Sequence, residues 1–234
     1  MRRFTAAAIA LAGSMCAPSA GGEVPAGEPL RFVFEVNWDG ATRDGDAYVF
    51  STNLGYTVGV RALYLAVDGV ELVPCETATA PLWSMATARA DHVWNSDSSY
   101  LAIGAVERLS EPSVWIAGTS VASGAAYCDL FWASSPIDAD APDGFVLSRA
   151  SIHLEGWFRA PEGETVDLAH EIPHGEGALL PVVFGPGERV VRLTRYPARS
   201  FDDLELADLS PSDVLFGVLQ RLGNTAEVTT ELAE

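Results

Sequence analysis

The sequence is poor in basic residues. Lysine and arginine together number 14 against 32 aspartates and glutamates, which gives 234 residues a formal net charge of −18 and a pI near 4.4. A surface of this charge repels nucleic acid and anionic lipid and attracts cations. DNA and RNA are therefore excluded as partners. The acidic residues are spread along the chain, so most of the charge indicates a solvated acidic surface.

Long apolar runs are also absent beyond the N-terminus. Residues 1–20 place two arginines before a short apolar stretch and then small residues, which is typical of a signal peptide cleaved after Ser19 or Ala20. Cys16 leaves lipidation as an alternative. No later segment is apolar enough for a transmembrane helix, and no repeat or linker divides the rest. We expect one exported domain over 21–234, in the periplasm or on the outer cell surface, either free or lipid-anchored.

Cysteine is scarce, with three in the chain. Once Cys16 is removed or lipidated, Cys75 and Cys128 remain in an oxidising compartment. We predict that these two form a disulfide. The alternative, two thiolate metal ligands, is disfavoured because neither belongs to a C-x-x-C pair.

The remaining chain alternates apolar and polar residues over short segments. "LRFVFEVNW", from Leu30, has the period-2 pattern of a half-buried strand, and "YTVGVRALYLAVDGVELVP" continues similarly. Asp68 and Gly69 between two apolar runs predict a hairpin turn. Short strands without interleaved amphipathic helices indicate a mainly β fold, an antiparallel β-sandwich that is immunoglobulin-like or related.

One helix is expected near the C-terminus, at about 211–222. In "LSPSDVLFGVLQRLGN", Ser210 is a suitable N-cap, Pro211 suits the first helical position and Gly223 can end the helix. The apolar residues recur at helical spacing, so this helix is expected to dock on the sandwich.

Motifs for catalysis are lacking. "GTSVA" approximates a nucleophile elbow, but the following residues predict a turn and a strand where the elbow requires a helix. We therefore expect no enzyme. Asp138, Asp140 and Asp143 in "DADAPDG" could offer oxygen ligands to calcium, although the spacing departs from an EF-hand loop and a solvated acidic loop is the favoured interpretation.

Histidine is rare, with four in the chain. If "DHVW" is extended, His92 and Trp94 share one face of a strand. In "SIHLEG", Ile152 and Leu154 would face the core and His153 the other side. Two imidazoles brought together in so acidic a chain would suit copper or zinc. The alternative is that Trp94 is an ordinary aromatic beside a solvated His92.

The segments "FVFEVN", "GVRALYLAVDGVELVPC", "AYCDLFW" and "SIHLEGWF", with the closing Phe-Asp segment before the helix, resemble the MbnP family. Those proteins are exported bacterial β-sandwich copper proteins, encoded beside di-haem partner enzymes that oxidise a tryptophan at the copper site. The resemblance lies in diffuse hydrophobic spacing over most of the chain after residue 20. It implies a copper ligand at His153 and a di-haem peroxidase-like partner, while the family's tryptophan-rich segment is missing here.

We therefore expect an exported copper-binding protein with His92 and His153 as metal ligands. Trp94 is the expected cofactor-site aromatic that a partner oxidises. The alternative is a metal-free envelope module of the same fold, whose loops contact a protein or a glycan.

Overall fold

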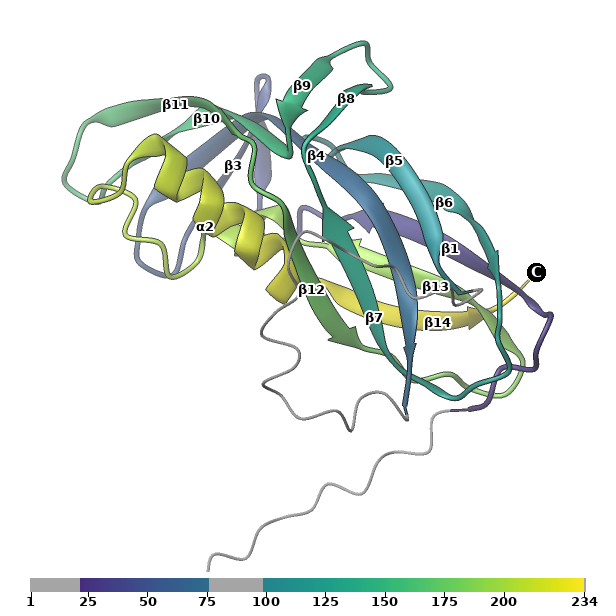
Figure 1. The fold of residues 1–234 in the computed structure, drawn as a ribbon. Coiled ribbons are helices and arrows are strands. Elements are labelled where there is room, and N and C mark those ends of the chain that lie inside the picture. The colour runs from purple at the N-terminus through teal and green to yellow at the C-terminus, as the bar shows by residue number, and fades with distance from the viewer. Residues whose placement is uncertain (1–21, 76–98, 234) are drawn as a thin grey trace, which may run out of the picture.

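The computed structural model describes residues 22–75 and 99–233, and it has the predicted mainly β architecture. Two sheets pack face to face around one large apolar core (Figure 1). The first sheet has the order β14 (Glu227–Leu232), β13 (Glu188–Arg195), β1 (Pro29–Val36) and β6 (Ser113–Val121). Its pairs are antiparallel except for β1 and β13, which run parallel.

The second sheet is built around one long strand, β4 (Thr57–Pro74). The first half of β4 pairs with β3 and β10, and the second half pairs with β5 and β7. The other strands of this sheet are β2 (Thr42–Asp44), β3 (Ala47–Ser51), β5 (Leu101–Arg108), β7 (Tyr127–Ser134), β10 (Ile152–Arg159), β11 (Thr165–Ile172) and β12 (Glu176–Pro181).

The hairpin turn predicted at Asp68 and Gly69 is wrong, because β4 runs straight through both residues. Gly69 instead marks an irregularity in the pairing of β4 with β5. A Cβ atom there would lie 2.7 Å from the Tyr100 ring and 2.9 Å from the Leu101 carbonyl oxygen. The glycine therefore serves a close approach of two strands rather than a turn.

The alternation predicted for β1 is confirmed. Leu30, Phe32, Phe34 and Val36 are all at most 2% exposed and enter the core. The predicted helix is also confirmed, as α2 (Pro211–Asn224), two residues longer than expected. The Ser210 hydroxyl accepts a hydrogen bond from the backbone N–H of Asp213, so Ser210 is the N-cap. The apolar side of α2 packs against β11 and β12 and against the short 3-10 helix η2 (Pro197–Phe201).

A small hairpin of β8 (Ile137–Asp140) and β9 (Val146–Ala150) packs on the outer side of β4, β5 and β10 in the second sheet (Figure 1). Its Leu147 and Ala150 pack on Tyr64, Ala66 and Val106 in a second, smaller apolar cluster. Tyr64 and Ala66 lie on the opposite face of β4 from the core residues Leu63 and Leu65, as strand geometry requires.

The predicted disulfide is present. Cys75 follows β4 and Cys128 lies in β7, with their Cα atoms 4.8 Å apart. These neighbouring strands are already paired at Val73 and Asp129. Thiolate metal ligation by the two cysteines is therefore excluded in this structure. No helix in the described residues is both long enough and apolar enough to span a membrane.

Candidate functional site

His153 is the described member of the predicted pair of metal ligands, because His92 and Trp94 lie outside the described residues. It sits in β10, opposite Tyr64 on β4 and opposite Glu171 on β11. Ile152 and Leu154 on either side are buried in the core, at 0% and 2% exposure. The sequence-based assignment of faces on this strand is therefore confirmed.

The His153 side chain is covered but not fully bonded. Only 13% of it is exposed, and the Phe145 ring beside the β8–β9 hairpin lies 4.7 Å from it, centroid to centroid. Its Nε2 is 3.2 Å from Glu155 Oε1. Its Nδ1 is buried and has no hydrogen-bond partner among the described residues, while Glu171 Oε2 lies 3.7 Å away. The imidazole therefore has one ring nitrogen free to bind, with a carboxylate beside it.

The geometry around Nδ1 suits a pair of metal ligands, but it supplies only two donor atoms. Metal–nitrogen and metal–oxygen bonds of about 2 Å each can bridge a gap like that between Nδ1 and Glu171. No group of three or more His, Cys, Asp and Glu side chains in the described residues could hold a metal ion. A complete site at His153 needs a further donor.

The other two described histidines serve contacts around α2. His170 Nε2 lies 2.7 Å from the Ser212 hydroxyl oxygen. The His174 ring packs edge-to-face on Phe216, with centroids 5.6 Å apart. His170 pairs with Leu154 in the register, so the alternation of β11 turns it to the opposite face from Glu171. The structure does not join either residue to His153.

The acidic loop proposed for calcium uses two of its carboxylates within the fold. Asp138 Oδ1 accepts a hydrogen bond of 3.0 Å from the backbone N–H of Arg149. Asp143 Oδ2 accepts one of 2.7 Å from the Tyr64 hydroxyl and lies 3.3 Å from Arg108 Nη1. These contacts account for both side chains without a metal. Calcium binding at Asp138, Asp140 and Asp143 stays a prediction.

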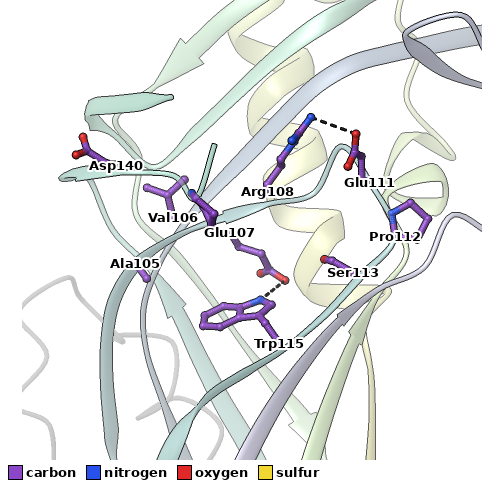
Figure 2. A pocket seen from close by; sticks show the side chains of 10 residues that line it. Ala105, Val106, Glu107, Arg108, Glu111, Pro112, Ser113, Trp115 and Asp140 are labelled. Atoms are coloured by element: carbon purple, nitrogen blue, oxygen red, sulfur yellow. Dashed lines mark hydrogen bonds and ion pairs between the residues drawn. The ribbon is translucent and has the colours of Figure 1, made fainter. Parts of the chain in front are cut away.

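A second candidate site, which we name the Trp115 cleft, lies where β5 turns into β6 beside the β8–β9 hairpin (Figure 2). Its volume is about 420 Å³, and most of its surface is apolar. The cleft is lined by Ala105, Val106, Glu107, Arg108, Glu111, Pro112, Ser113, Trp115, Asp140 and Pro142. A cavity of this size can hold a small organic molecule.

A buried ion pair lies behind the cleft. Figure 2 shows Glu107 directed toward Trp115, whose Nε1 donates a hydrogen bond of 3.5 Å to Glu107 Oε1. Arg195 Nη1 donates to the other oxygen of Glu107 at 2.5 Å. The guanidinium also lies over the rings of Phe34 and Trp132, at 4.8 and 4.9 Å. Burial raises the pKa of Glu107 and lowers the pKa of Arg195, while the attraction between the two opposes both shifts.

Sequence reasoning missed this cleft, although the sequence does contain a signal for the ion pair behind it. Leu101, Ile103 and Ala105 alternate in β5, and Glu107 continues the same inward row. Arg195 likewise continues the inward row of its strand. Two opposite charges at core positions of separate strands can be buried only if they meet. Trp115 gives no such signal, because an aromatic in a strand is ordinary.

No protein-family model matches the chain, and no curated protein matches it. Among solved structures the chain is similar to MbnP from Methylosinus trichosporium, with 11% sequence identity and a TM-score of 0.34. The similarity covers 74% of this chain and 77% of that one. The resemblance expected from the sequence is thus confirmed only as a weak structural likeness, and no residue is matched through it.

Proposed function

We propose that this protein is exported and binds copper, with His153 as a ligand. One observation carries the proposal: His153 Nδ1 is buried without a hydrogen-bond partner among the described residues, and it lies 3.7 Å from a Glu171 oxygen. A buried polar atom left unbonded costs free energy, and a metal ion would remove that cost. His92 supplies the further donor in this proposal.

The type of donors favours copper among the divalent metals. Imidazole nitrogen is a preferred copper ligand, and a given nitrogen and oxygen site binds Cu²⁺ most tightly in the first-row series. The formal charge of −18 concentrates cations at the surface. Both cysteines of the described part of the chain are held in the disulfide, so imidazole is the softest donor left there. The proposal includes Trp94 beside the metal and a di-haem peroxidase-like partner that acts on it.

Copper titration of the purified mature protein tests the proposal. We expect His153→Ala and His92→Ala each to weaken binding at least about tenfold, since even the outer partners of metal ligands are worth 10–100-fold in affinity. Glu171→Gln should weaken it less, because an amide oxygen remains. His174→Ala is the matched control and should bind like the wild type. Unchanged affinity in His153→Ala would overturn the proposal.

A second candidate function is a metal-free binding module of the cell envelope. The Trp115 cleft favours it, because a preformed cavity with apolar walls is typical of a ligand site. The two candidates use different residues, so variants separate them. Trp115→Phe should leave copper affinity unchanged, and His153→Ala should leave binding in the cleft unchanged.

A further inference from the structure

The charges around the Trp115 cleft favour a positive ligand. Arg108 and Glu111 both line the cleft, and Arg108 Nη2 lies 3.3 Å from Glu111 Oε1, so their charges balance. The exposed Asp140 also lines the cleft, and no basic side chain of the described residues pairs with it. Apart from the buried Glu107, two carboxylates therefore face one cation among the lining residues.

The buried ion pair of Glu107 and Arg195 behind the cleft adds no net charge to it. Arg195 already neutralises Glu107, and neither side chain is more than 1% exposed. The excess charge that a ligand meets is thus the negative charge of the rim. The walls are mostly apolar and offer few oxygen atoms, so a bare metal ion lacks the ligands it requires.

The indole of Trp115 supplies a matching surface. Tryptophan is the best aromatic partner for a cation. Its Nε1–H donates a hydrogen bond of 3.5 Å to the Glu107 carboxylate, which orients the indole in the cleft. Phe34 packs edge-to-face on Trp115 with centroids 5.1 Å apart, so the ring is held in place.

We infer that the Trp115 cleft binds an organic cation with apolar substituents, such as a quaternary ammonium group. The inference rests on the second candidate function and names its class of ligand. The apolar substituents contact the walls, the positive charge meets Trp115, and Asp140 at the rim balances it. A quaternary ammonium group occurs both in free solutes and in lipid headgroups, and the chemistry of the cleft is the same for both.

Calorimetric titration with choline and with its uncharged analogue 3,3-dimethylbutan-1-ol tests the inference. The two molecules have the same shape, so a difference in affinity reports the charge. We expect choline to bind about tenfold more tightly, as a desolvated cation–π contact allows. A chelator in the buffer keeps copper from contributing. Sedimentation with phosphatidylcholine vesicles then tells a lipid surface from a free solute as the source.

Variants assign the binding to the cleft. Trp115→Phe should weaken choline binding several-fold and leave binding of the analogue nearly unchanged, because tryptophan binds cations more strongly than phenylalanine. Asp140→Asn should weaken choline binding and reduce its dependence on salt. Trp157→Phe and Glu162→Gln, which lie outside the cleft, are the matched controls. Thermal unfolding confirms that each variant is folded.

Equal affinity for choline and the analogue would overturn the inference while leaving a binding module for neutral ligands. Failure of both molecules to bind would overturn the inference, while a module that contacts a protein or a glycan would remain as the second candidate function. Choline binding that is unchanged in both Trp115→Phe and Asp140→Asn would place the cation elsewhere and overturn the assignment to the cleft.

Discussion

Arg195 and Glu107 face each other between the two sheets, where their side chains are 0% and 1% exposed. Taking both charges out of water costs several kcal/mol per ion, and their attraction offsets that cost only while both are present. The pair also joins the two sheets, because Arg195 lies in β13 and Glu107 in β5. The contribution of the ion pair to stability is therefore measured by comparing a variant that lacks one charged side chain with a variant that lacks both.

We predict that Glu107→Ala lowers the free energy of unfolding by about 3–5 kcal/mol, because it leaves Arg195 buried without a counter-charge. The double variant Glu107→Leu with Arg195→Met should cost less, since apolar side chains of similar size replace the whole pair. Urea unfolding of the three proteins measures this. A double variant less stable than the single one would contradict the argument.

The ionisation of the Tyr64 hydroxyl makes stability depend on pH. Burial, the hydrogen bond to Asp143 and the charge of Asp143 raise the pKa of the Tyr64 hydroxyl to about 12 from its ordinary 10.0. The unfolded chain then loses this proton first, so the contribution of Tyr64 to stability is complete below pH 10 and declines as the pH rises above it. Ultraviolet absorbance of the wild type minus that of Tyr64→Phe should show a midpoint well above 10. A midpoint near 10 in protein that is still folded would refute the shift.

The disulfide joins the end of β4 to β7 across a sequence separation of 53 residues. On the loop-entropy description, closing a loop of this length stabilises the fold by about 4 kcal/mol. We predict that Cys75→Ala combined with Cys128→Ala lowers the free energy of unfolding by about that amount. Reduction of the wild type should give a similar loss in denaturant unfolding. A loss under about 1 kcal/mol would show that the strand pairing alone holds this region.

The sequence predicted those elements whose signal is local. Alternation located β1 and the inward side of β10, and the capping residues located α2. Asp68 and Gly69 misled because the same dipeptide that favours a turn also permits two strands to approach closely. The parallel pairing of β1 with β13 could not be predicted, since no local pattern records which distant strand is the neighbour.

The two candidate sites were likewise predictable only where their signal is local in the sequence. The face of His153 was predictable from period 2, but its cover was not, because Phe145 reaches it through the packing of a separate hairpin. The Trp115 cleft depends on the meeting of β5, β6 and the β8–β9 hairpin, so it exists only in the folded chain. Residue types indicated the available chemistry, and the topology decided which groups were brought together.

The net charge of −18 causes a general repulsion among the surface groups. Raising ionic strength from 0.1 to 1 M shortens the screening length from about 10 to about 3 Å. We predict that sodium chloride raises the Tm over this range, because screening the general repulsion outweighs weakening the exposed ion pairs. Differential scanning calorimetry measures it, with sucrose as an uncharged control. A Tm that falls with salt would mean that the local ion pairs dominate.

The parallel pairing of β1 with β13 also sets the timing of folding. Glu35 on β1 and Arg192 on β13 are joined by an ion pair across 157 residues of sequence. At a synthesis rate of 5–20 residues per second, β1 waits about 8–30 s before its neighbour has been made. The first sheet therefore cannot close around the core until nearly the whole chain has left the ribosome. Nascent chains that end before β13 should remain sensitive to protease. Each chain should become resistant only when its synthesis is nearly complete.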